Sequence, residues 1–161
     1  MGKNIPAATA DFTSRLQTEC DALKEFVTLL ETEQQALISG NTEQLLPLAD
    51  NKVLAAQELS ELAKVRSDGL LALAGKNNPG DMAAWLQAHA ANSLPVWQNI
   101  LQLAEKAQQL NRTNGILIQT KLRHNQQALM ALQSAAHSTS GLYGPDGQHN
   151  LAAPSRILGS V

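Results

Sequence analysis

Apolar positions over the first forty residues recur with the spacing of a helix that packs against another helix. A leucine stands at every seventh position from residue 16, and mostly apolar residues fill the four-residue steps between the leucines. The stripe consists of Leu16, Cys20, Leu23, Val27, Leu30, Gln34 and Leu37. This heptad pattern predicts one long helix, from near Pro6 to Ser39 and Gly40, that needs a partner helix along the stripe.

The next segment, residues 41–75, predicts a second long helix with two stripes that compete for its buried face. One stripe consists of Leu45, Lys52, Leu59, Arg66 and Leu73. The other has smaller side chains, which allow a close helix approach, and consists of Leu46, Ala49, Val53, Ala56 and Ala63. We expect Lys52 and Arg66 to lay their stems along apolar surface and keep their charges in water. Because Pro47 lies inside the segment, we also expect a kink or a short helical turn before it.

Two more helices are predicted after a loop at residues 76–81. The first is short, with Met82, Trp85 and Leu86 on one side and Asp81 as its N-cap. The second is the longest of the chain, beginning near residues 92–93 and running to about residue 137. A single helix of this length presents a continuous stripe that other helices can cover.

The apolar repeat of this longest helix changes between Leu110 and Leu122. The spacing there is 4,4,4, whereas 4,3 steps hold on either side, and such a stutter locally unwinds a left-handed supercoil. Asn111, Asn114 and Gly115 lie inside it. We therefore expect an N-terminal half that belongs to a permanent core and a C-terminal half, residues 118–132, that faces a different partner. The periodicity alone is explained equally well if the second stripe belongs to the permanent core.

Composition supports an all-α fold. The 161 residues are rich in leucine and alanine and include only two Phe, two Trp and one Tyr, so aliphatic side chains must supply the core. We expect an antiparallel bundle of long, coiled-coil-like helices with one short helix and an irregular C-terminal tail. The expected domains are a helical bundle at residues 1–140 and a turn with a flexible tail at residues 141–161.

Charge argues against nucleic acid or an anionic membrane as a direct partner. The net charge of -2 creates no strong field. Residues 1–50 hold eight acids and three bases, whereas residues 91–137 hold four bases and one acid, Glu105. These opposite signs favour long helices lying side by side, although solvated faces of either sign explain them too.

The sequence shows no constellation typical of an enzyme, a metal site or a cofactor site. The four histidines lack paired-ligand spacing, Cys20 has no histidine near it in sequence, and no glycine-rich phosphate loop precedes a helix. Cys20 on an apolar stripe is expected to be a small core residue. A lone cysteine, the absence of a signal segment and the absence of any run of 18 apolar residues favour a cytoplasmic protein. With enzymes, metal proteins and cofactor proteins set aside, the sequence favours a binding or assembly protein.

Three segments together resemble the FlgN family of flagellar export chaperones. They are LISGNTEQLLPLADNKVLAAQEL at residues 37–59, LNRTNGILIQTKLRHNQQALMAL at 110–132 and LYGPDGQ at 142–148. The resemblance implies a non-catalytic cytoplasmic helical bundle that binds the C-terminal helical segments of hook-associated proteins, the subunits of the hook–filament junction. It also implies that the bundle prevents their premature assembly and delivers them to the type III export gate, its only membrane contact.

Two candidate sites follow from this resemblance and from the stripe. The candidate client-binding residues are Ile118, Leu122, Asn125, Leu129, Met130 and Leu132, because an amphipathic helix in an apolar groove is a common recognition mode. Tyr143 stands between turn formers, where an aromatic ring either caps the bundle or anchors a partner. The resemblance favours docking of Tyr143 on the cytoplasmic domain of the export gate. The competing hypothesis is a structural adaptor or self-associating coiled coil without a client.

Overall fold

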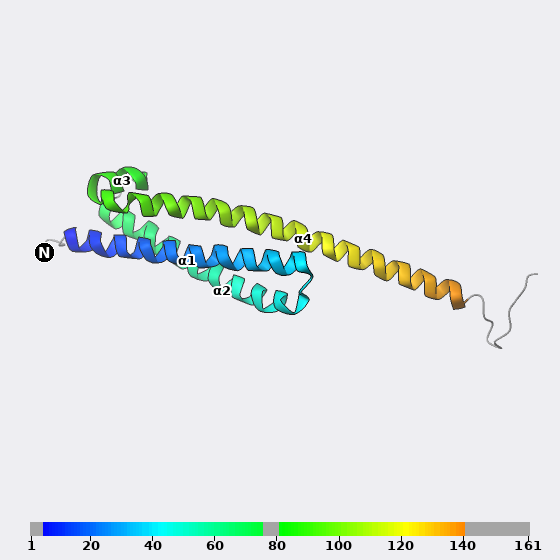
Figure 1. Cartoon of the computed structure of the whole chain (residues 1–161). Coiled ribbons are helices and arrows are strands. Elements are labelled where there is room, and N and C mark those ends of the chain that lie inside the picture. Colours follow the sequence, from blue (N-terminus) through cyan, green and yellow to red (C-terminus); the bar gives the residue numbers. More distant parts are fainter. Residues whose placement is uncertain (1–4, 76–80, 141–161) are drawn as a thin grey trace, which may run out of the picture. The chain divides into compact units, whose positions relative to one another are not determined.

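The computed structural model describes residues 5–75 and 81–140, and these residues form helices with no strand among them (Figure 1). The helices are α1 (Ile5–Ser39), α2 (Leu45–Ala74), α3 (Met82–His89) and α4 (Leu94–Ser140). Short 3-10 turns at Thr42–Gln44 and Ala91–Ser93 precede α2 and α4. The prediction of an all-α fold with long helices and one short helix is confirmed.

The chain divides into two compact units between residues 118 and 119. The first unit, Met1–Ile118, contains α1, α2, α3 and the beginning of α4. The second unit, Gln119–Val161, contains the remainder of α4. The expected domain boundary at residue 140 lies at the edge of the described residues and stays a prediction.

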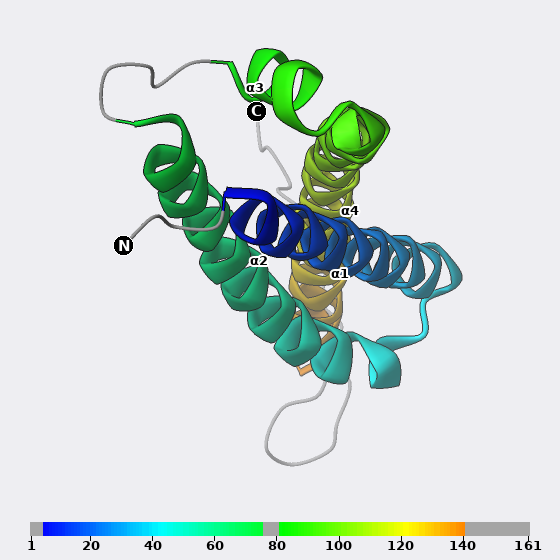
Figure 2. The same ribbon diagram turned by 90° about the vertical axis from the view of Figure 1, so that its left-hand side faces the viewer.

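Ion pairs between α1 and α2 fix the direction of these two helices. Glu33 of α1 pairs with Lys52 early in α2, and Glu19 of α1 pairs with Arg66 late in α2. The order of partners is therefore reversed along α2, so α1 and α2 form an antiparallel hairpin. Figures 1 and 2 show the two helices side by side.

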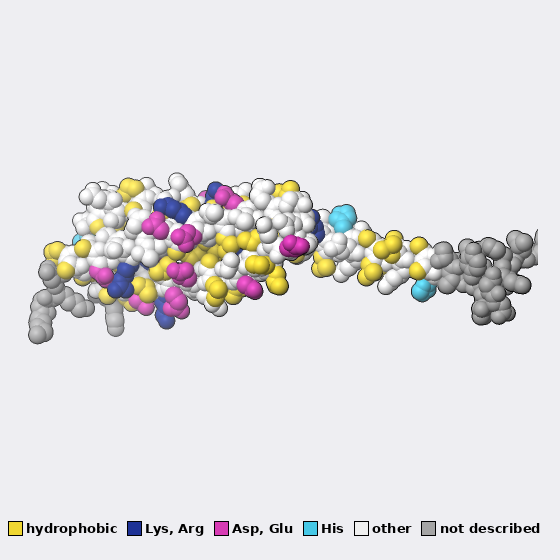
Figure 3. Space-filling model, turned by 60° about the horizontal axis from the view of Figure 1, so that its bottom comes forward, with side chains coloured by type: hydrophobic (Ala, Val, Ile, Leu, Met, Phe, Trp, Pro, Cys, Tyr) yellow, Lys and Arg dark blue, Asp and Glu magenta, His cyan; other side chains and the backbone are white. Residues whose placement is uncertain are grey.

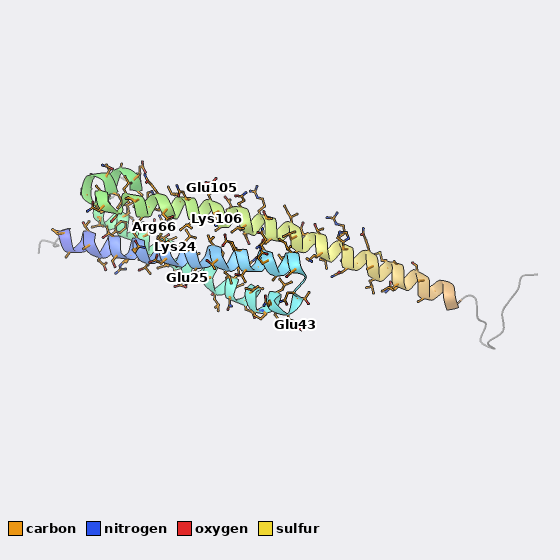
Figure 4. All side chains as sticks on the ribbon, viewed as in Figure 1. Lys24, Glu25, Glu43, Arg66, Glu105 and Lys106 are labelled. Atoms are coloured by element: carbon orange, nitrogen blue, oxygen red, sulfur yellow. The ribbon has the colours of Figure 1, made fainter. Side chains whose placement is uncertain are left out.

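Contacts between α1 and α4 run in the same order along both helices. The Asn99 Nδ2 donates to the Cys20 Sγ at 3.4 Å, and the Lys106 Nζ lies 2.7 Å from the Glu31 Oε1. Figure 4 labels Lys106 on α4. Within the first unit α4 is therefore parallel to α1 and antiparallel to α2. This up-down-up order is the natural result when long helices are joined in sequence by connections that reverse the chain.

The core of the first unit contains the heptad stripe of α1. Every residue of that stripe is buried except Gln34, which is half-buried, and Cys20 is a core residue as predicted. The predicted face of α3 is buried as well, and the Trp85 ring meets the Phe12 ring edge-on at 5.3 Å between centroids. The buried cluster is Phe12, Leu16, Cys20, Leu23, Val27, Leu30, Met82, Trp85, Leu86, Ile100 and Ala107.

The start of α2 corrects one expectation about Pro47. A separate 3-10 turn precedes α2 as expected, but α2 itself begins at Leu45, so Pro47 lies in its first turn. Its missing N–H causes no loss there, because first-turn amides have no carbonyl partner within the helix. No kink is required. Gly40 and Gly75, with φ of 74° and 78°, end α1 and α2 at the expected positions.

Helix α2 uses the stripe with the two basic residues as its inward face. Leu45, Lys52, Leu59, Arg66 and Leu73 are all half-buried, whereas Leu46 and Val53 of the small-residue stripe are exposed. The expectation that Lys52 and Arg66 keep their charges in water is wrong, because buried carboxylates of α1 neutralise them. The Arg66 guanidinium also lies 4.9 Å from the Trp97 ring centroid.

The opposite charges of the two ends of the chain meet at one place only in the described residues. Lys106 pairs with Glu31, but both side chains are about half exposed, so this pair adds little stability. The buried acids of α1 are neutralised from α2 instead. The expectation that complementary charge aligns α1 with α4 therefore holds for a single pair.

Asp81 caps α3, as predicted. Its Oδ1 accepts from the Ala83 backbone N–H at 3.0 Å. We expect Asp81→Ala to reduce the free energy of unfolding by about 1 kcal/mol, because an N-terminal amide of α3 loses its acceptor. Chemical denaturation followed by circular dichroism measures the change. Asp81→Asn retains the acceptor and should stay near wild type, and equal stability of the Ala and Asn variants would contradict the cap.

Candidate partner-binding surface

The C-terminal half of α4 carries a stripe of large apolar side chains exposed to solvent. The exposed fraction is 44% for Ile118, 56% for Leu122, 57% for Leu129 and 68% for Leu132. Asn125, in the same stripe, is exposed too. Residues three and four apart lie on one face of a helix, so Leu122, Asn125, Leu129 and Leu132 share one face within the second unit. We call these residues, together with Ile118, the α4 stripe.

Beside the α4 stripe, Met130 is 66% exposed. No side chain of residues 122–137 is even half-buried. The sequence from residue 106 to residue 145 contains no acid, while Lys121 and Arg123 lie next to Leu122. Lys121, four residues before Asn125, borders the α4 stripe, whereas Arg123, four residues before Gln127, lies on the opposite side of the helix. The surface is therefore apolar with one base on its border. Its use as a client site stays a prediction.

A buried polar cluster stands where the buried part of α4 ends. Asn114 is fully enclosed, and no residue of α4 from 115 to 137 is buried. Its Nδ2 donates to the Leu30 carbonyl and to the Glu33 Oε2, each at 2.8 Å. The Lys52 Nζ lies 2.8 and 3.0 Å from the two Glu33 oxygens. Side chains from α1, α2 and α4 thus meet in one polar layer, which we call the Asn114 layer.

The other residues of the predicted stutter have no comparable contacts. Asn111 is exposed, and a Cβ placed on Gly115 would meet nothing within 4 Å. Helix α4 continues through the stutter from Leu94 to Ser140. The change of spacing therefore coincides with the Asn114 layer rather than with an interruption of the helix.

Sequence reasoning missed the acids of α1 that hold the two basic residues of α2. Glu19 and Glu33 are 14 residues apart, and Lys52 and Arg66 are also 14 residues apart. Two heptads separate the members of each pair, so both pairs can meet across one antiparallel hairpin. This matched 14-residue spacing is the sequence signal from which the two ion pairs could have been predicted.

A second exposed surface lies along the α1–α2 hairpin. A groove of about 600 Å³ is lined by residues of both helices, among them Phe12, Arg15, Val65, Asp68 and Ala72.

In the part of the chain that the structure describes, no three acidic, cysteine or histidine side chains are grouped to hold a metal ion. No described helix is long and apolar enough to cross a membrane. Tyr143 lies outside the described residues.

Comparison with known proteins decides the family. The family model described as FlgN protein matches residues 1–150. The chain belongs to the FlgN family. The flagella synthesis protein FlgN of Yersinia enterocolitica (strain NCTC 13174 / 8081) is 35% identical over 137 residues, covering 83% of this chain and 88% of that protein. FlgN of Salmonella typhimurium is 30% identical, covering 81% and 84%, and FlgN of Escherichia coli K12 is 28% identical, covering 78% and 80%.

The FlgN match includes both candidate sites. Residues 1–150 contain the α4 stripe as well as Tyr143. No solved structure matches the chain with comparable significance. Membership of the FlgN family confirms the resemblance found in the sequence and connects the chain with flagellum assembly.

Proposed function

We propose that this chain is a non-catalytic cytoplasmic chaperone for flagellar export. It binds the C-terminal helical segments of hook-associated proteins, prevents their premature assembly and delivers them to the type III export gate. The observation that carries the proposal is the α4 stripe, a run of large apolar side chains left exposed at the C-terminal half of α4. FlgN family membership supports the flagellar setting.

An amphipathic helix is the ligand that fits such a stripe. Apolar residues at positions 118, 122, 129 and 132 follow 4,3 spacing across one polar position, Asn125, and a client helix with the same spacing interdigitates with them. Burial of apolar surface contributes about 25 cal/mol per Å², so a pair of such stripes supplies substantial binding energy. The polar Asn125 favours one register of the client helix.

Covering a client's assembly segment also explains protection before export. A helical segment that packs with its own kind in the junction exposes an apolar face while it is a monomer in the cytoplasm. Such a face promotes association. A chaperone that buries the same face keeps the subunit soluble until the export gate receives it.

Calorimetric titration with the C-terminal segment of a hook-associated protein tests the proposal. We expect a 1:1 complex with a negative heat-capacity change, the mark of apolar burial. A control segment with its apolar residues changed to serine should not bind. If the chain forms a stable oligomer that ignores the client segment, the structural adaptor hypothesis is correct instead.

Docking at the export gate is proposed for Tyr143. We expect Tyr143→Ala to retain client affinity and melting temperature but to weaken binding to the gate's cytoplasmic domain at least tenfold, about 1.4 kcal/mol. The reason is that tyrosine supplies a large contact area and a hydroxyl group at low entropic cost. Surface plasmon resonance between the chaperone–client complex and the purified gate domain measures the change. Equal affinities of variant and wild type would reduce Tyr143 to a structural role.

A further inference from the structure

The solvent side of α2 is strongly acidic. Because Lys52 and Arg66 turn inward to Glu33 and Glu19, Lys64 is the one exposed base of this helix and its preceding 3-10 turn. The exposed acids of the same segment are Glu43, Asp50, Glu58, Glu61 and Asp68. Neutralisation of the two inward bases thus leaves an excess of negative charge facing solvent.

The same side of the hairpin is also apolar. Leu54 and Val65 of α2 are exposed, and Val65, together with Phe12 and Ala72, lines the groove between α1 and α2. Asp68 lies on the border of that groove. Figure 3 shows apolar side chains gathered among acidic ones, with some basic side chains between them, on this face. We call this surface, with its groove and its acids, the α2 face.

The chain itself contains a segment whose chemistry is complementary to the α2 face. Residues 119–137 carry Lys121 and Arg123 and no acid, and the leucines of the α4 stripe in this segment are exposed. The groove itself is lined by two acids, Asp11 and Asp68, and two bases, Arg15 and Arg66, so the acidic excess lies on the solvent side of α2. A basic amphipathic helix fits that side, because Lys121 at the edge of its apolar stripe can face the acids of α2 while its leucines contact the apolar residues among them. At about 1.5 Å per residue, this segment is shorter than the 30-residue α2.

We propose that the α2 face of one copy of this chain binds residues 119–137 of a second copy. Each copy holds both surfaces, so a two-fold axis satisfies both at once and gives a closed dimer. Charge and apolar complementarity support the proposed dimer, and its formation does not require a client. If the α4 stripe also binds a client, the client and the second copy exclude one another.

Sedimentation velocity on the full chain, with charge-reversal variants, tests the dimer. We expect a monomer–dimer equilibrium that shifts toward monomer as salt rises, because salt screens the border charges. Glu61→Lys with Asp68→Lys should weaken the dimer at least tenfold, and Lys121→Glu with Arg123→Glu should do the same. The matched control is Glu105→Lys, an exposed acid of α4 outside both surfaces (Figure 4), which should leave the equilibrium unchanged.

Sedimentation velocity on a mixture of the two charge-reversal variants provides the decisive test. In the mixed dimer each α2 face meets a segment of opposite charge, so the mixture should form heterodimers as tightly as wild type although each variant alone does not. Wild type that is monomeric at every concentration would overturn the proposal. A dimer that is indifferent to both reversals, or a mixture that stays monomeric, would overturn it as well.

Cross-linking shows whether the segment that occupies the α2 face comes from a second copy or from the same chain. Val65→Cys in one chain and Leu122→Cys in another place thiols on the two surfaces, whereas the native Cys20 is buried. We expect a mixture of the two variants to form disulfide-linked heterodimers, which the wild type with Cys20 alone does not form. A chain carrying both substitutions that links only within itself would show that the segment folds back on its own copy and would overturn the dimer.

Discussion

Lys52→Met is expected to lower the free energy of unfolding by about 3 kcal/mol, the lower end of the effect of removing one partner from a buried ion pair, because the Lys52 side chain is 25% exposed. The Glu33 side chain is 5% exposed, and Lys52 contacts both of its carboxylate oxygens. Methionine retains the length of the lysine stem, so the loss is mainly that of the charge. Glu33 then remains buried with Asn114 as its one remaining partner. Urea denaturation followed by circular dichroism measures the loss.

Two variants control this experiment. Lys64→Met removes an exposed lysine from the same helix and should change stability by less than about 0.5 kcal/mol. Adding Glu33→Gln to Lys52→Met removes the buried charge and should recover most of the lost stability. If Lys52→Met is no more harmful than Lys64→Met, the Asn114 layer does not stabilise the bundle as described.

Leu122→Asp and Leu129→Asp are each expected to abolish detectable client binding while the melting temperature stays near wild type. Both leucines are more than half exposed in the free chain, so an aspartate there costs the fold little. In the proposed complex the same aspartate would be a buried, unpaired charge, which costs several kcal/mol. Calorimetric titration with the client segment and thermal melts on the same samples provide both measurements.

Ala131→Asp is the matched control, because it places the same charge at an exposed position of the same helix away from the α4 stripe. It should bind the client within about twofold of wild type. Client binding by Leu122→Asp at wild-type affinity would exclude this stripe as the client site. Unfolding of the free protein by either leucine variant would instead show that the stripe belongs to a permanent core.

Much of the fold could be predicted because period and end signals act locally. The heptad of α1 identifies its buried face, and Asp81, Gly40 and Gly75 mark helix ends through their own backbone preferences. The face of α2 was not decided by its pattern, because two stripes had similar apolar content. The structure favours the stripe with Lys52 because a buried acid on the neighbouring helix neutralises it, and that partner is 19 residues away in sequence.

The periodicity of α4 predicted which of its faces is apolar but did not decide whether that face is buried. A repeat of leucines shows which side of a helix is apolar, yet it is the same for a core and for a solvent-exposed surface. Ile100 and Leu122 occupy equivalent positions of the α4 pattern, but Ile100 is buried and Leu122 is exposed. The difference depends on whether another helix lies opposite, which is a property of the packed chain.

Amide hydrogen exchange of the full chain, with and without a client C-terminal segment, tests the central claim most directly. In dilute free protein we expect fast exchange at residues 118–132 and slow exchange along the buried stripe of α1, since exchange follows local stability. Addition of the client segment should slow exchange at residues 118–132 and leave α1 unchanged. Unchanged exchange at residues 118–132 in a saturated complex would contradict the assignment of the α4 stripe as the client-binding surface.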